Sequence, residues 1–312
     1  MSAASLIILS LVGLVFLIIC LVVFKFRKAM ANHYNRINDI PSEVFASSLG
    51  EIAYLLQGRG PTILVSHGIT GGVDQGMELS NDYFDEGYRF LFVSRFGYLG
   101  SSKPDNATPK LQAQVYKELI DYLGIKKVFV FGNSAGSTSA LHFAIKYPNS
   151  CAGLILISPN APLNVSSPHP PKFVFRFNFL YWIMMKLLGR RMLNMFVPKT
   201  VLRGLSKEKI NQITNDIYFS ALSVSKRFEG IVFDLFISNP SINSEVLFEK
   251  IVVPTLIINA VDDPATLIEG AVTLARMIKT SNLQTFDTGG HLLLGHEEEI
   301  KQDVSEFISK HP

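Results

Sequence analysis

The sequence has few cysteines and no pattern of closely spaced metal ligands. Its 312 residues contain two cysteines, Cys20 and Cys151, which excludes a framework of disulfide bonds. Neither cysteine has His or Cys neighbours at the spacing of a metal site. Both lie in or beside apolar runs, so we expect them to behave as small hydrophobic residues.

The chain also has little net charge, and that charge is unevenly distributed. Of the 29 Lys and Arg residues, four lie in the first 38 residues, which contain no Asp or Glu. The other 274 residues carry 25 basic and 26 acidic side chains, so they have no basic excess for nucleic acid and we expect no such partner. Hydrophobic residues make up 48% of the chain, which is enough for a large core and excludes global disorder.

One long hydrophobic run lies near the N-terminus. Residues 6–24 read LIILSLVGLVFLIICLVVF, without a charge. As a helix they would span about 28 Å, close to the ~30 Å of a hydrocarbon core. The cations of KFRK follow this run, which favours an uncleaved single-pass membrane anchor with the rest of the chain on the cytoplasmic side. A cleaved signal sequence is the alternative.

The rest of the chain alternates between short apolar runs and helix-like stretches. Six runs have the length and composition of buried strands: 62–66, 90–93, 128–131, 154–158, 255–259 and 283–286. Most of them are apolar throughout, which is typical of a parallel sheet covered on both faces. Helix-like stretches such as 110–123 and 137–146 lie between them, so the order predicts an α/β fold with a mostly parallel, doubly wound sheet. Residues 51–55 are expected to add an antiparallel strand.

The regular alternation stops for about ninety residues after the run at 154–158, which we take as the sixth strand of the sheet. That region opens with NAPLNVSSPHPP and continues with helix-like segments. We therefore predict a helical cap inserted after the sixth strand. The chain divides into an anchor with a basic juxtamembrane segment (1–38), the first part of the core (39–159), the helical cap (160–249) and the second part of the core (250–312).

The stretch GNSAG places Ser134 between Gly132 and Gly136, where a predicted strand meets a predicted helix. In this context G-x-S-x-G indicates a nucleophile elbow, a strained turn that lifts the serine hydroxyl clear of the sheet. The glycines leave room for strand and helix to approach, and the helix N-terminus offers N–H groups to a developing negative charge. Serine is also a good helix N-cap, so a capping role for Ser134 is the alternative.

A glycine-rich turn, SHGITGG, follows the strand at 62–66. We expect the N–H groups of Ile69 in this turn and of Ala135 after the serine to form an oxyanion hole. His67 is expected to hold the turn by hydrogen bonding. Arg95, in SRFGYLGSS, is expected to brace loops rather than to bind substrate.

Two further motifs supply an acid and a base. AVDDP follows a late strand, so its acids lie where sites in α/β sheets gather. We take Asp263 as the orienting acid, with Asp262 as its competitor. TGGH follows the last strand and places His291 on a glycine-containing loop that can reach Ser134 and accept its proton.

The chain order Ser134, Asp263, His291 is that of the α/β-hydrolase fold. With SHGITGG, SRFGYLGSS, GNSAGS, AVDDP and TGGHLLLGHEEE, the sequence from about residue 44 to 312 resembles bacterial serine esterases and lipases of the α/β-hydrolase superfamily with a helical cap. The resemblance implies a serine hydrolase that forms an acyl-enzyme on Ser134 and needs no metal or organic cofactor. It leaves the substrate open, because the superfamily also contains thioesterases, peptidases and C–C hydrolases.

The predicted cap is rich in large apolar side chains, with KFVFRFNFLYWIMM at 172–185. These residues either pack the cap onto the core or lie partly in the lipid interface. With the anchor, they favour a lipophilic acyl ester, such as a lipid, as substrate. A proline-iminopeptidase-like peptidase and a non-catalytic, membrane-tethered binding protein are the alternatives.

Overall fold

The computed structural model describes residues 2–163, 171–244 and 246–312. Residue 1 of the predicted anchor segment, and residues 164–170 and 245 of the predicted cap, lie outside the described residues.

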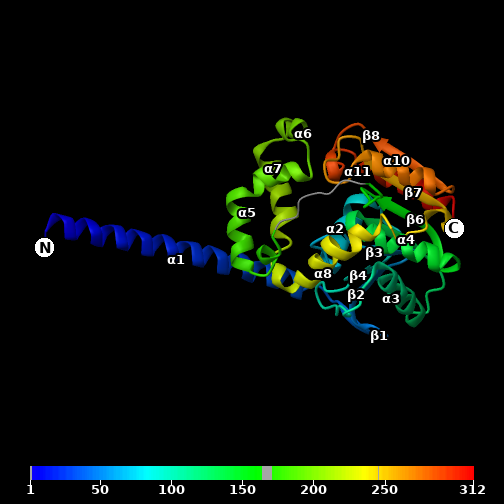
Figure 1. Ribbon diagram of the computed structural model, residues 1–312, viewed down its shortest axis with the longest axis horizontal. Helices are drawn as coiled ribbons and strands as arrows, with labels where there is room; N and C mark the ends of the chain where they lie inside the picture. Colours follow the sequence, from blue (N-terminus) through cyan, green and yellow to red (C-terminus); the bar gives the residue numbers. More distant parts are fainter. Residues whose placement is uncertain (1, 164–170, 245) are drawn as a thin grey trace.

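An eight-stranded sheet forms the centre of the molecule (Figure 1). Its strands in sequence order are β1 (Glu43–Ser47), β2 (Gly50–Gly58), β3 (Thr62–Ser66), β4 (Arg89–Val93), β5 (Val128–Asn133), β6 (Cys151–Ile157), β7 (Thr255–Ala260) and β8 (Ser281–Phe286). They are arranged in the order β1-β2-β4-β3-β5-β6-β7-β8. Strand β2 is antiparallel to both neighbours, and every other pair is parallel. Each predicted strand is present, and β1 is an additional strand that we did not predict.

Helices cover both faces of this sheet. One face carries α3 (Pro109–Tyr122), α4 (Ser137–Lys146) and α10 (Ile268–Met277). The other carries α2 (Val73–Tyr83) and α11 (Glu297–Ser309). Because both faces are covered, the central strands β3, β5, β6 and β7 are buried along their whole length, which explains their continuous apolar runs. The prediction of an α/β, doubly wound, mostly parallel sheet is confirmed.

The polypeptide between β6 and β7 is helical wherever the structure describes regular elements, and it contains no strand in 158–163, 171–244 or 246–254. Its α-helices are α5 (Asn178–Met192), α6 (Lys199–Gly204), α7 (Lys207–Thr214), α8 (Phe228–Phe233) and α9 (Asn239–Ser241). Helices α5, α6 and α7 stand away from the sheet in Figure 1. This is the cap that we predicted after the sixth strand.

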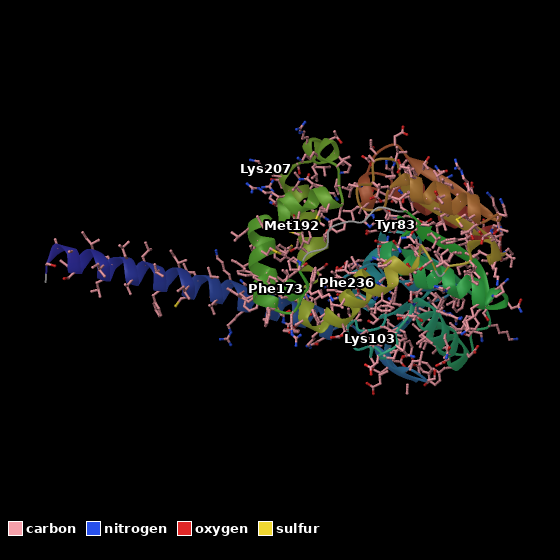
Figure 2. All side chains as sticks on the ribbon, in the orientation of Figure 1. Tyr83, Lys103, Phe173, Met192, Lys207 and Phe236 are labelled. Atoms are coloured by element: carbon pink, nitrogen blue, oxygen red, sulfur yellow. The ribbon has the colours of Figure 1, made fainter. Side chains whose placement is uncertain are left out.

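Helix α1 (Ala3–Asn38) is unbroken and projects from the rest of the molecule (Figure 1). Of the helices described, it alone is long and apolar enough to cross a membrane, and its most apolar window is not buried. Figure 2 shows the side chains of its N-terminal part standing free of every other element. Its C-terminal part continues past the apolar run, and Met30 and His33 are buried there against the cap.

A buried ion pair ties the cap to the core. Asp234 lies in η7 (Asp234–Ser238), a short π-helical segment of the cap, and its two carboxylate oxygens accept hydrogen bonds of 2.6 and 2.5 Å from the guanidinium of Arg95. Tyr98 donates a third hydrogen bond to the same carboxylate. Neither member of the ion pair is exposed to solvent. The pair is tolerated in the protein interior because each charge neutralises the other.

We expect Asp234→Asn to lower the free energy of unfolding by about 3–5 kcal/mol, because the Arg95 charge would remain buried without its counterion. Urea unfolding of the full chain in detergent measures this. Lys117→Gln is the matched control, because it breaks the exposed pair of Lys117 with Asp121 and should cost less than about 1 kcal/mol. Equal losses in the two variants would show that the buried pair does not tie the cap to the core.

Candidate active site

Ser134 lies on a strained turn between β5 and α4. Its φ angle is +49°, in the left-handed region that residues other than glycine rarely adopt. A Cβ atom at Gly136 would lie 2.1 Å from the carbonyl oxygen of Ser66, so only glycine lets this turn approach the end of β3. A Cβ atom at Gly132 would lie 2.8 Å from Cα of Ser137. The motif is therefore the strand–turn–helix elbow that the sequence indicates.

Strand β5 and the loop after β8 bring a serine and a histidine together. Nε2 of His291 lies 3.0 Å from Oγ of Ser134. Nδ1 of the same ring lies 2.9 Å from Oδ2 of Asp263, which follows β7. The serine hydroxyl does not cap α4, whose N-cap residue Gly136 makes no side-chain capping bond. The three residues proposed from the sequence thus form one continuous hydrogen-bonded chain.

The structure distinguishes the two neighbouring acids. Asp263 is buried against His291, whereas Asp262 turns the other way and accepts a 2.8 Å hydrogen bond from the backbone N–H of Gly290. Asp263 thus contacts the imidazole, and Asp262 supports the loop that carries it.

Thr266 completes the setting of Asp263, and we did not single it out in the sequence. Its backbone N–H donates to Oδ1 of Asp263 at 2.9 Å, and its hydroxyl donates to Oδ2 at 2.6 Å. Burial alone would raise the pKa of the Asp263 carboxyl, but His291 and the hydrogen bonds from Thr266 outweigh burial and lower it. The acid is therefore held ionised. The sequence does contain a local signal for this turn. The carboxylate of an Asp can accept hydrogen bonds from the backbone N–H groups two and three residues later.

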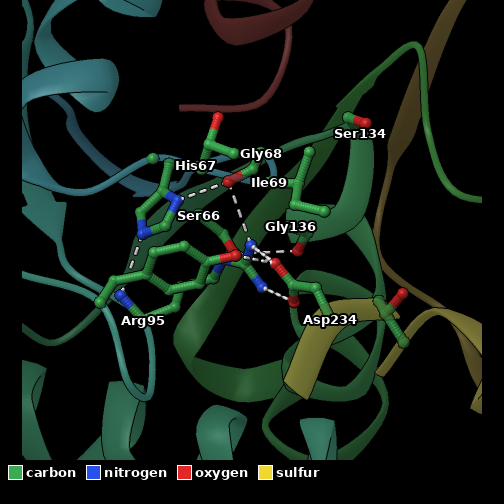
Figure 3. A network of polar contacts seen from close by, with 12 residues as sticks. Ser66, His67, Gly68, Ile69, Arg95, Ser134, Gly136 and Asp234 are labelled. Atoms are coloured by element: carbon green, nitrogen blue, oxygen red, sulfur yellow. Dashed lines mark hydrogen bonds and ion pairs between the residues drawn. The ribbon is translucent and has the colours of Figure 1, made fainter. Parts of the chain in front are cut away.

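The predicted oxyanion turn lies directly beside the serine. A Cβ atom at Gly68 would be 3.6 Å from Cβ of Ser134, and Figure 3 shows Ile69 and Ser134 on adjacent segments. Ala135 is the second residue of η1 (Ser134–Gly136). At that position the backbone N–H has no carbonyl acceptor within the helix. The role of Ile69 and Ala135 as oxyanion donors stays a prediction.

His67 holds this turn from inside the protein. It is fully buried, and burial together with the nearby charge of Arg95 keeps its pKa well below the ordinary value. The neutral ring accepts a 3.0 Å hydrogen bond from the backbone N–H of Arg95 at Nε2, so its Nδ1–H donates to the carbonyl of Gly68 at 2.7 Å (Figure 3). His67 therefore has a structural role, as its place in the turn suggested.

These features agree with comparisons to known proteins. A family model described as the alpha/beta hydrolase fold matches residues 61–297. The chain belongs to the α/β-hydrolase family. A 2-hydroxy-6-oxo-6-phenylhexa-2,4-dienoate hydrolase of Comamonas testosteroni is 32% identical over 112 residues, 35% of this chain and 37% of that protein.

Two longer matches support the same assignment. A 2-hydroxy-6-oxononadienedioate/2-hydroxy-6-oxononatrienedioate hydrolase of a Pseudomonas species is 24% identical over 234 residues, 73% of this chain and 80% of that protein. The solved structure of an esterase from Exiguobacterium antarcticum superimposes with a TM-score of 0.64 at 21% identity, covering 85% of this chain and 98% of that one. At such low identity, the structural match speaks for the fold alone.

A second buried arginine braces the glycine-rich turn after β3 of this α/β hydrolase. Arg227, just before α8 in the cap, donates to the carbonyl oxygens of Thr70 (3.0 Å) and Gly71, and pairs with the carboxylate of Asp74 at 2.7 Å. Burial would raise the pKa of Asp74, but Arg227, helped by Arg36, holds it at about 2. The carboxylate therefore stays charged and keeps Arg227 in place beside the turn.

Arg36 connects the N-terminal helix to the same network. Its guanidinium donates to Asp74 at 3.0 Å, to Glu78 at 3.0 Å and to the backbone carbonyl of Ser220 in the cap at 2.6 Å. Helix α1, the cap and the oxyanion turn of the hydrolase thus share one set of charged contacts. We identified none of these partnerships from the sequence.

The cap also contacts the loop that carries the histidine. The backbone N–H of His291 donates to the carbonyl of Phe196 at 2.7 Å, and the two rings lie 5.8 Å apart between centroids. From the core side, the hydroxyl of Ser158 donates to the carbonyl of His291 at 2.9 Å. The backbone of His291 is therefore held from both sides.

We expect Asp263→Asn to slow the reaction of Ser134 with a fluorophosphonate by a factor on the order of 10⁴, because the amide no longer fixes the imidazole in the tautomer that accepts a proton at Nε2. The rate of covalent labelling measures this without requiring knowledge of the substrate.

Asp262→Asn is the matched control for this experiment. An asparagine there can still accept the hydrogen bond from Gly290, so the labelling rate should change by less than about tenfold. A larger loss in the Asp262 variant than in the Asp263 variant would reverse the assignment of the triad acid.

Proposed function

We propose that this α/β hydrolase is a membrane-anchored serine hydrolase that cleaves a lipophilic carboxylic ester through an acyl-enzyme on Ser134. The observation that carries the proposal is the chain of hydrogen bonds from Ser134 through His291 to an ionised Asp263, with the serine on a strained elbow. Nothing in packing alone requires a half-buried serine in a left-handed conformation beside a histidine.

The geometry supports the following steps. Oγ of Ser134 attacks the acyl carbon while Nε2 of His291 takes the hydroxyl proton, and Asp263 stabilises the imidazolium that forms. The N–H groups of Ile69 and Ala135 receive the negative charge of the carbonyl oxygen. His291 then gives the proton to the departing alkoxide. A water molecule, deprotonated by His291, releases the acid and regenerates the serine.

The apolar composition of the cap favours a lipophilic acyl group. Ile69, Leu292 and Leu294, from the two loops beside the triad, pack against the apolar cluster of the cap. The loops that flank Ser134 therefore pack into the apolar core of the cap, and these apolar surroundings suit a substrate with a hydrocarbon chain.

The curated relatives suggest a different substrate, a 2-hydroxy-6-oxo-dienoate that carries carboxylates. Such a substrate needs a cation beside the serine. Arg95 and Arg227 both reach the turn beside the serine, but the charge of each is already paired with a buried aspartate. This favours an uncharged ester over a dicarboxylate for this chain.

A peptidase and a non-catalytic binding protein are both less well supported. A peptidase that recognises a free amine would need an acid in the cap, but Asp234 is occupied by Arg95, and Glu208, Asp216 and Glu229 are exposed. A binding protein without catalysis would have no need of a complete and strained triad.

We expect the full chain in detergent to hydrolyse p-nitrophenyl esters, with a higher kcat/KM for medium and long acyl chains than for acetyl, and Ser134→Ala to abolish turnover. A graded series of acyl lengths, assayed beside 2-hydroxy-6-oxononadienedioate, measures this. Faster turnover of the dienoate would replace the ester with that substrate class. No turnover of either, with no fluorophosphonate labelling of folded protein, would reject the hydrolase mechanism at Ser134.

The membrane anchor is part of the same proposal. The apolar run at 6–24 continues without a break into a helix that packs against the cap from Val22 onward, so a signal-peptidase site would have to lie within that continuous helix. This supports an uncleaved anchor. The cations after the run favour a cytoplasmic catalytic domain.

We expect protease added outside sealed, right-side-out vesicles to leave the catalytic domain intact, and protease added to inverted vesicles to digest it. Immunoblotting with an antibody against the C-terminus measures both. The intact mass of the purified chain is the control for cleavage. Digestion from the outer side would reverse the orientation, and a mass lacking roughly the first 20 residues would indicate a signal sequence.

A further inference from the structure

A hollow lies where helix α1 leaves its apolar run and meets the cap. Its volume is about 580 Å³, and its lining consists of Lys25, Lys28, Ala29 and Asn32 from α1 with Trp182 and Lys186 from α5. The α1 residues are spaced by three and four positions and so share one face of that helix. No local sequence motif predicts this hollow, because the residues of its two walls are about 150 positions apart in the chain.

The position of the hollow along α1 corresponds to the headgroup layer of a bilayer. Lys25 is the first residue after the apolar run at 6–24. Lys28 follows about 4.5 Å further along the helix axis and Asn32 about 6 Å beyond that, at ~1.5 Å per residue. If residues 6–24 fill the hydrocarbon core, the hollow begins at its edge.

The hollow is strongly cationic. Its lining includes three lysines and no acidic residue, and no described Asp or Glu forms an ion pair with Lys25, Lys28 or Lys186. Lys186 packs over the ring of Phe219, with Nζ 4.2 Å from the centroid. The buried indole N–H of Trp182 has no acceptor in the part of the chain that the structure describes. The three lysines thus bring positive charge to one small space that no acidic side chain lines.

Helix α5 crosses α1 at this level in Figure 1, and edge-to-face contacts of Phe26 with Phe179 (5.1 Å) and Trp182 (5.6 Å) hold the two helices together. Leu187 is 73% exposed, and Leu188 and Phe179 are also exposed. Exposed apolar groups beside lysines and a tryptophan are typical of a helix at the membrane interface.

We propose that this hollow, the α1–α5 lysine site, binds the phosphate of an anionic phospholipid headgroup. The inference rests on the proposed anchoring of residues 6–24. Three ammonium groups match a lipid whose headgroup has a net negative charge, and they repel the terminal ammonium of a zwitterionic lipid. A bound phosphate bridges the anchor and the cap, and so holds the cap at a defined position on the membrane surface.

Trp182 makes the site directly observable, because it is the single tryptophan of the chain. The full chain is placed in lipid nanodiscs in which either phosphatidylglycerol or phosphatidylcholine carries bromine atoms near the headgroup. We expect brominated phosphatidylglycerol to quench Trp182 at a lower mole fraction than brominated phosphatidylcholine. In Lys25→Gln/Lys28→Gln/Lys186→Gln, this preference should fall by at least about fivefold.

The matched control is Arg27→Gln/Arg190→Gln/Arg191→Gln. It removes the same number of cations from the same two helices, but none of the three lines the hollow. We expect this control to keep most of the preference for phosphatidylglycerol. An equal loss in both triple variants would show a general surface charge effect and overturn the site.

Two further measurements distinguish the ways in which this proposal could be wrong. Glycerol 3-phosphate and inorganic phosphate, added at millimolar concentration, should not relieve the quenching, and relief by either would replace the lipid with a soluble phosphate. Failure of the chain to enter nanodiscs, as judged by size-exclusion chromatography, would reject the anchor itself. Entry without any preference for phosphatidylglycerol would reject only the lysine site, and ester hydrolysis measured on the same discs reports separately on the proposed enzymatic function.

Discussion

Two buried arginine–aspartate pairs determine how the parts of this molecule meet. Arg95 extends from the end of β4 to Asp234 in the cap, and Arg227 extends from the cap to Asp74 in α2. Both guanidinium groups also donate to carbonyl oxygens of the turn after β3. A buried charge persists only where counterion and hydrogen bonds replace the water that it has lost. This requirement places cap, sheet and oxyanion turn in one arrangement.

The cap connects three functions that lie far apart in the sequence. The Phe196 carbonyl accepts a hydrogen bond from the backbone of His291, Arg227 supports the turn beside Ser134, and Trp182 packs against Phe26 of α1. Through Arg36, the end of α1 reaches the same Asp74 that holds Arg227. A displacement of the cap relative to α1 would therefore affect both the turn after β3 and the loop that carries His291. The active site and the N-terminal helix are coupled through packed, charged contacts rather than through a flexible linker.

Much of the fold and the triad could be predicted because the signals are local. Strands buried on both faces appear as continuous apolar runs, and the motifs around Ser134 and Asp263 each follow such a run. The motif around His291 follows β8, which is more polar and only partly buried. The choice between Asp262 and Asp263 could not be made from these signals. Adjacent residues in a turn point in different directions, and the turn's hydrogen bonds to Thr266 and Gly290 decide which one faces the imidazole.

The sequence by itself determined the α/β class, the order of the strands along the chain, the helical insertion and the serine and histidine that the fold brings together. Each of these depends on a periodicity or motif within a few residues. Only the tertiary structure decided which charges pair, which part of α1 packs against the cap, and which lysines share a hollow. Those features join residues that lie far apart in the chain, such as Arg36 with Asp74 and Lys25 with Lys186. No local pattern records such pairings, because they arise only when packing brings distant surfaces together.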